Sequence, residues 1–169
     1  MVPGFDREVL ADIAREPKYC SFDKSSIDKM PDLVVLFVSD ARPSCLLPSQ
    51  DAIFIECKPV DIDHPAGTHY CEKGIARFVR GEYAWAMTSA LMVAYCRPGY
   101  TILPKLADAL RSHAQICSVS ARPSACVRSR GTPLAEVVHV TEHTRNFKYV
   151  ETGESPPMIV LRHLWLARN

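Results

Sequence analysis

The chain has 169 residues, which is enough for one domain with a hydrophobic core. Hydrophobic residues make up 47% of it and charged residues 23%, and the formal net charge is +1. This balance excludes the strongly basic class of nucleic-acid-binding proteins, so any phosphate-binding surface has to come from local clustering of charge. The seven cysteines form no Cys-x-x-Cys pair. We therefore expect reduced thiols rather than a disulfide framework.

Neither a secretory signal nor a membrane span is expected. The first residues include Pro3 and Gly4 and then charged side chains, without the apolar segment of a signal peptide. The most apolar run, residues 84–95, is shorter than the roughly 20 residues that cross a bilayer, and it is interpreted as a buried helix. These features predict a cytoplasmic protein that does not act at a membrane.

The hydrophobic pattern predicts a mixture of helices and strands along the chain. Helices are expected at residues 5–16, 70–95 and 103–114, and strands at 33–38, 52–57, 137–141 and 158–165. Residues 118–133 are expected to form a surface loop that carries Arg122, Arg128 and Arg130. These arginines either contact nucleic acid or belong to a flexible, solvated loop. This order predicts a single α/β (α+β) domain over residues 1–169, with a central mixed β-sheet flanked by helices.

The two central strands carry charged residues at ends that can meet. Pro31-Asp32 opens the first strand, and Glu56-Cys57-Lys58 closes the second. If the two strands are antiparallel neighbours, their acids come together at one place. Glu56 and Lys58 are two positions apart and therefore point to the same face of the sheet, whereas Cys57 is expected to point the other way, into the core.

Two carboxylates beside a lysine suit the cleavage of a phosphodiester bond. Carboxylate oxygens are hard ligands of the kind that Mg²⁺ binds. A bound Mg²⁺ polarises a phosphate and lowers the pKa of its water, while a lysine orients that water or stabilises the charge of the transition state. The competing interpretation is a solvent-facing ion pair at a strand end, which contributes little to stability.

The run Pro-Asp, then Leu-Val-Val, then Phe-Ile-Glu-Cys-Lys resembles the signature of the PD-(D/E)xK, or restriction-endonuclease-like, superfamily. The resemblance covers residues 5–95. It implies a restriction-endonuclease-like αβββαβ core, Mg²⁺ with Mn²⁺ as a substitute, and nucleic acid as substrate, DNA rather than RNA. It also implies roles for individual residues: metal ligands at Asp32 and Glu56, the catalytic lysine at Lys58, and a further acid on the first helix at Glu8 or its rival Asp12.

The function that the resemblance implies is that of a Mg²⁺-dependent endonuclease in restriction, repair or anti-phage defence. The expected partners are nucleic acid and either a second copy in a homodimer or the other subunits of a larger complex. The first alternative is a catalytically inactive subunit that uses the nuclease fold for binding or assembly. The second is a small-molecule enzyme or assembly protein in which Glu56 and Lys58 merely pair.

Basic and aromatic residues of the predicted helix at 70–95 have two interpretations each. Lys73, Arg77 and Arg80 share one helix face, where they contact a phosphate backbone or form solvated pairs with nearby acids. Tyr83 and Trp85 could stack on bases, but their apolar neighbours favour packing in the core.

Histidines occur in two further clusters. His64, His69 and Cys71 are suitable ligand types for zinc, but their spacing matches no common zinc pattern, so a loop near the site is favoured. His139, His143 and Arg145 alternate along a predicted strand and its end. We expect these three side chains to share a solvent-exposed face.

Overall fold

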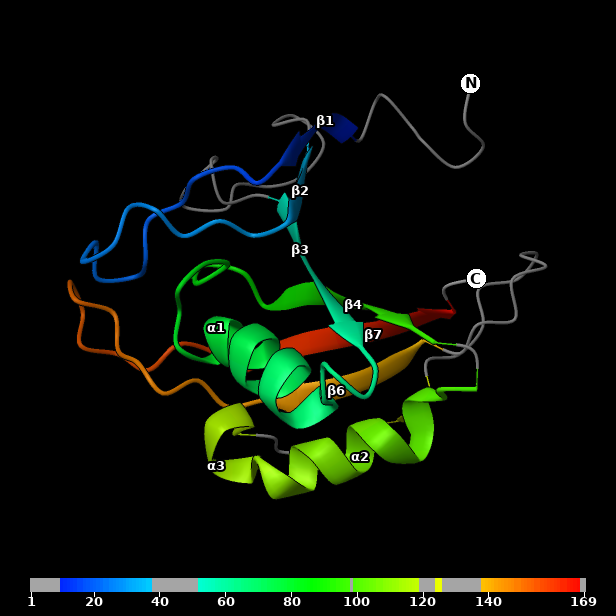
Figure 1. The fold of residues 1–169 in the computed structure, drawn as a ribbon. Coiled ribbons are helices and arrows are strands. Elements are labelled where there is room, and N and C mark those ends of the chain that lie inside the picture. Colours follow the sequence, from blue (N-terminus) through cyan, green and yellow to red (C-terminus); the bar gives the residue numbers. More distant parts are fainter. Residues whose placement is uncertain (1–9, 38–51, 98, 119–123, 126–137, 168–169) are drawn as a thin grey trace.

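The computed structural model describes residues 10–37, 52–97, 99–118, 124–125 and 138–167 (Figure 1). In this part of the chain, a seven-stranded mixed sheet has the order β1-β2-β3-β4-β7-β6-β5. Its strands are β1 (Leu10–Arg15), β2 (Leu33–Phe37), β3 (Ala52–Val60), β4 (Ser89–Cys96), β5 (Ser124–Ala125), β6 (His139–His143) and β7 (Ile159–Ala167). The helices are the π-helix η3 (Ala66–Ile75), α1 (Ala76–Val79), α2 (Ile102–Ser112) and α3 (Ala114–Cys117).

The type of strand pairing changes twice across the sheet. β1, β2 and β3 pair in antiparallel fashion, β3 pairs with β4 and β4 with β7 in parallel, and β7, β6 and β5 are again antiparallel. Helices η3 and α1 form the connection from β3 to its parallel neighbour β4, as a parallel pair requires. The expected mixed sheet flanked by helices is therefore confirmed.

The helices lie together on one side of the sheet, while β1 and β2 extend beyond the helical layer (Figure 1). The core fills the space between the two layers. It contains Phe54, Met92 and Leu161 from the strands and Ile75 and Leu106 from the helices, all fully buried. Among the described residues, every helix is too short or too polar to be a membrane span.

Helix η3 approaches the sheet closely at Gly74. A Cβ atom added there would lie 2.7 Å from Cε of Met92 and 3.6 Å from Cγ of Lys58. Because a side chain would collide with Met92, the absence of one allows the helix to pack directly on β3 and β4.

The prediction of a first helix at residues 5–16 is wrong in its described part. Leu10–Arg15 forms β1, which pairs with β2 at the edge of the sheet. Val9, Leu10, Ile13 and Ala14 have the spacing of a helical stripe, but four apolar residues are a weak signal, and Ile13 is 50% exposed. Backbone pairing with the open edge of β2 outweighs that weak local preference. Glu8 and the rest of residues 5–9 lie outside the described part.

The prediction of one long helix at residues 70–95 is also wrong. The helix ends at Val79, and residues 89–96 form β4. Gly81 and Ala84 have positive φ angles of 69° and 51°, which turn the chain back toward the sheet. A short apolar run such as Leu-Met-Val-Ala-Tyr fits a buried strand as well as a helix.

The remaining predicted elements are found close to their expected positions. The helix at 103–114 corresponds to α2, and the strands at 33–38, 52–57, 137–141 and 158–165 correspond to β2, β3, β6 and β7. The predicted loop at 118–133 is described only at Ser118 and in β5. Arg122, Arg128 and Arg130 lie outside the described residues.

Candidate active site

Antiparallel pairing of β2 and β3 brings the two acids of the sequence pattern together. Leu33 pairs with Ile55, so the next positions along the two strands, Asp32 and Glu56, lie across from each other. Oδ2 of Asp32 accepts a hydrogen bond of 2.6 Å from the backbone N–H of Cys57. The Asp32 carboxylate is thereby fixed against the middle of β3, beside Glu56.

Lys58 lies between the two acids. Its Nζ forms an ion pair with Oε1 of Glu56 and lies 3.8 Å from Oδ2 of Asp32. The Glu56 side chain is fully buried, that of Lys58 is 16% exposed and that of Asp32 is 37% exposed. The ammonium group offsets the repulsion between the carboxylates, and the cluster is open to solvent on the side of Asp32.

Glu56 points into the core. The expectation that Cys57 does so, with Glu56 on the other face, is wrong. Ala52 and Phe54, which share the face of Glu56, are fully buried beneath the helices, whereas Cys57 is half-buried on the opposite face. The helices cover the face that carries the acid, Ala52 and Phe54, whereas Ile53 and Ile55 lie on the opposite, less buried face. Burial raises the pKa of the Glu56 carboxyl, and hydrogen bonds from Lys58 and Tyr83 oppose the rise.

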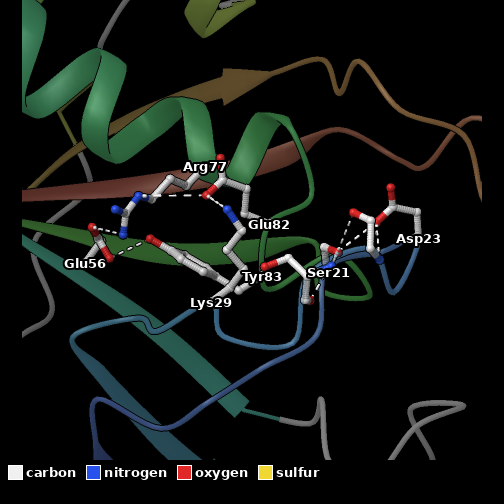
Figure 2. A network of polar contacts seen from close by, with 9 residues as sticks. Ser21, Asp23, Lys29, Glu56, Arg77, Glu82 and Tyr83 are labelled. Carbon is white, nitrogen blue, oxygen red and sulfur yellow. Dashed lines mark hydrogen bonds and ion pairs between the residues drawn. The ribbon is translucent and has the colours of Figure 1, made fainter.

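Two further side chains bind the Glu56 carboxylate (Figure 2). The Tyr83 hydroxyl donates a 2.5 Å hydrogen bond to Oε2, and Nη1 of Arg77 donates a 3.2 Å bond to Oε1. The expected burial of Tyr83 is confirmed, but its polar contact was not predicted. A buried tyrosine needs a partner for its hydroxyl, which is a usable signal once a buried acid is known.

The site is part of a row of alternating charges. Beyond Glu56, Nε of Arg77 lies 3.9 Å from Oε2 of Glu82, and Nζ of Lys29 lies 3.1 Å from the same oxygen (Figure 2). The row is thus Lys29, Glu82, Arg77, Glu56, Lys58 and Asp32, with three positive and three negative groups. A buried carboxylate is tolerated here because its charge is paired and its oxygens accept hydrogen bonds.

The three basic residues expected on one helix face have different surroundings. Arg77 turns inward to Glu56 and Glu82, whereas Lys73 and Arg80 are exposed. Lys73 lies in a π-helix, whose turn is wider than that of an α-helix, so the spacing assumed from sequence does not hold across the junction with α1. Lys73 and Arg80 are the members of this group that are accessible to a phosphate.

The expectation that His139, His143 and Arg145 face solvent is wrong. Their exposed fractions are 4%, 0% and 8%. His139 and His143 lie on the buried face of β6, where the ring of His143 contacts Oγ1 of Thr141 and the carbonyl oxygen of Cys117. Arg145 donates to the carbonyl oxygens of Ala84 and Trp85 at 2.7 and 2.6 Å. It therefore supports the turn from which Tyr83 reaches Glu56.

The residues considered for zinc do not form a joint site. Nδ1 of His64 lies 2.8 Å from Oδ1 of Asp61, while Cys71 is buried in the core. In the part of the chain that the structure describes, no three His, Cys, Asp or Glu residues are grouped so that they could hold a metal ion. Asp12, the rival position for a third acid, is exposed in β1, where its Oδ1 accepts the N–H of Ile13.

The donors at Asp32 and Glu56 nevertheless match the chemistry of Mg²⁺. This ion takes oxygen ligands and commonly only one or two carboxylates from a protein, with water and substrate phosphate as the others. The oxygens of Glu56 now accept bonds from Lys58, Arg77 and Tyr83. A cation bound at Glu56 would therefore replace the Lys58 ammonium as the partner of Oε1.

Comparison with known proteins adds no family to this description. No protein-family model, curated protein or solved structure matches the chain. The geometry of the site and the chemistry of its residues are therefore the basis for a function.

Proposed function

We propose that the chain is a metal-dependent nuclease of the PD-(D/E)xK type, which hydrolyses phosphodiester bonds in nucleic acid, DNA rather than RNA. The observation that carries the proposal is the meeting of Asp32, Glu56 and Lys58 at one point between β2 and β3. Two acids and an amine with partial access to solvent are the groups that such a reaction uses.

The order of the elements supports the restriction-endonuclease-like core of the proposal. Within the described residues, strands β1, β2 and β3, the helical connection and β4 follow one another as βββαβ, which is the part of the implied core that comes after its first helix. β1 supplies the strand before Pro31 that the sequence pattern does not reveal. The proposed core therefore spans β1 to β4, with the site in its centre.

Each residue of the site has a separate task in the proposed reaction. Asp32 and Glu56 would hold Mg²⁺, which when bound polarises the phosphate and lowers the pKa of water. Lys58 would leave Glu56 and contact the phosphate or the attacking water, where its charge stabilises the transition state. Tyr83 and Arg77 keep the Glu56 carboxylate in a fixed orientation. Lys73 and Arg80 would contact the nucleic-acid backbone.

A plasmid-nicking assay with Mg²⁺ or Mn²⁺ tests the proposal. We expect the wild-type protein to nick the plasmid, and Asp32→Asn and Lys58→Met to lower the rate by about 100-fold or more, since each removes a charged group from the site. Lys18→Met is the matched control, because Lys18 is 69% exposed and pairs only with the exposed Asp28 in the contacts described. Nicking by Asp32→Asn and Lys58→Met at the control rate would refute the assignment.

A second candidate is an inactive subunit that retains the fold for binding or assembly. The full burial of Glu56 and the three side chains that bind its oxygens favour it, because a structural ion-pair network has the same appearance. If the wild-type protein cleaves neither DNA nor RNA with either metal but binds nucleic acid in EDTA, this second function replaces the first.

A further inference from the structure

A continuous chain of buried hydrogen bonds joins the helices to the far half of the sheet. The Tyr70 hydroxyl of η3 contacts Nδ1 of His163 in β7 at 2.9 Å. Oγ1 of Thr141 in β6 lies 2.6 Å from Nε2 of both His163 and His143. Nδ1 of His143 contacts the carbonyl oxygen of Cys117 in α3 at 2.6 Å. We call these five residues the histidine chain.

The proton positions along the histidine chain follow from one fixed end. The Cys117 carbonyl can only accept, so His143 carries its proton on Nδ1 and its Nε2 accepts from the Thr141 hydroxyl. Thr141 then accepts from Nε2–H of His163, and Nδ1 of His163 accepts from the Tyr70 hydroxyl. With both imidazoles neutral, each of these contacts joins one donor to one acceptor. A second proton on His163 would turn the Tyr70 hydroxyl to the Met92 carbonyl oxygen at 3.3 Å.

An added proton disrupts this arrangement. With a proton on Nε2 of His143, the ring nitrogens of His143 and His163 would both donate to Oγ1 of Thr141. The hydroxyl hydrogen of Thr141 would then lose its acceptor. Both imidazoles are fully buried, so the resulting charge would also lack solvation. Burial lowers the pKa of His143 to about 4 and that of His163 well below its usual value.

The groups around the two imidazoles do not favour a positive charge. His139 lies directly across from His163 in the β6–β7 register, and His139 and His143 both lower the pKa of His163. η3 contributes Tyr70 and the buried Cys71, α3 contributes the buried Cys117, and β4 contributes Met92. The neighbours are thus imidazoles, thiols, a phenol and apolar groups.

We infer that the histidine chain is an acid-sensitive latch, which holds η3 and α3 on β6 and β7 only while His143 and His163 are neutral. The latch lies close to the candidate site. Met92 pairs in register with Glu56 on one side and with His163 on the other. η3 continues directly into α1, which carries Arg77. Opening of the latch would therefore loosen the helix that places Arg77 on Glu56.

Hydrogen exchange measured at pH 7.5 and pH 5, corrected for the intrinsic rate, tests the latch directly. We expect amides of η3 and α3 to lose protection at pH 5 while those of β4 and β7 keep it. Imidazole ¹⁵N spectra at pH 7.5 should show the Nδ1–H tautomer for His143 and the Nε2–H tautomer for His163. The opposite tautomers, or helix amides that keep their protection at pH 5, would overturn the inference.

Urea denaturation across the same pH range provides an independent test. The folded pKa values are depressed, so the stability from the two histidines is present above pH 6.5 and is lost as the pH falls toward about 4. Each histidine changes the folding equilibrium by up to about tenfold per pH unit. His143→Gln should therefore make the folding equilibrium less dependent on pH, by up to about tenfold per pH unit. An unchanged pH dependence in this variant would refute the role of His143.

Discussion

The Tyr83 hydroxyl donates a 2.5 Å hydrogen bond to Oε2 of Glu56, although the two residues are 27 positions apart. Lys58 reaches the same carboxylate from its own strand, and Arg77 reaches it from α1. The turn that carries Tyr83 is in turn held by Arg145 through the carbonyl oxygens of Ala84 and Trp85. Glu56 is thus oriented from β3, from α1 and from the turn of Tyr83, which Arg145 holds in place.

Tyr83→Phe removes the hydroxyl and leaves the ring in the core. We expect the free energy of unfolding to fall by about 2 kcal/mol, because a buried carboxylate oxygen loses a charge-assisted hydrogen bond. Urea denaturation at pH 7 measures the change. Tyr149→Phe is the matched control, since its hydroxyl makes a longer, 3.3 Å bond to the Trp85 carbonyl in a half-buried position. Equal losses in the two variants would contradict the importance of the Glu56 contact.

Glu56→Gln should change how stability depends on pH. Burial raises the pKa of Glu56 in the folded protein above 4.5, so the folded state binds this proton more tightly than the unfolded state does. The stability from that proton is present below pH 4.5 and is lost as the pH rises through the folded pKa. We therefore expect Glu56→Gln to gain stability relative to the wild type as the pH increases from 4.5. Urea titrations of both proteins at pH 4.5, 6 and 7.5 measure the difference, and a difference that stays constant or shrinks would contradict it.

Gly81→Ala should destabilise the protein more than Gly153→Ala does. Both glycines have positive φ, 69° and 70°, so alanine costs about 1 kcal/mol of backbone strain at either position. At Gly81 the new Cβ would also lie 2.7 Å from Cε1 of Phe147, whereas nothing lies within 4 Å at Gly153. The additional loss is about 1–3 kcal/mol. Thermal unfolding of the two variants measures it, and equal melting temperatures would show that the Phe147 ring moves aside at little cost.

The central part of the fold could be predicted from local sequence patterns. The runs of β2 and β3 are apolar and rich in β-branched residues, with Asp32 just before β2 and Glu56 and Lys58 within β3. The meeting of Asp32 with Glu56 follows from antiparallel pairing alone, which a short connection favours. Lys58 shares a face with Glu56 because side chains alternate along a strand.

Contacts between distant segments explain why the rest could not be predicted. The run that forms β4 has no polar alternation, since it is buried between β3 and β7, and such a run also fits a helix. His139 and His143 were expected in solvent because alternating polar residues usually face water. Both are buried instead, and the ring nitrogens of His143 find partners there in Thr141 and the Cys117 carbonyl.

At Gly74, η3 comes so close to β4 that a larger residue would displace either the end of the buried Met92 side chain or the helix itself. A shift of the helix would withdraw Arg77, less than one turn further along, from its bond to Glu56. Proteins that descend from a common ancestor with this chain and keep its carboxylate cluster should therefore also keep the combination Glu-x-Lys followed by Gly-x-x-Arg. A search with this short fingerprint has a prospect of finding homologues that comparisons over the whole chain do not detect.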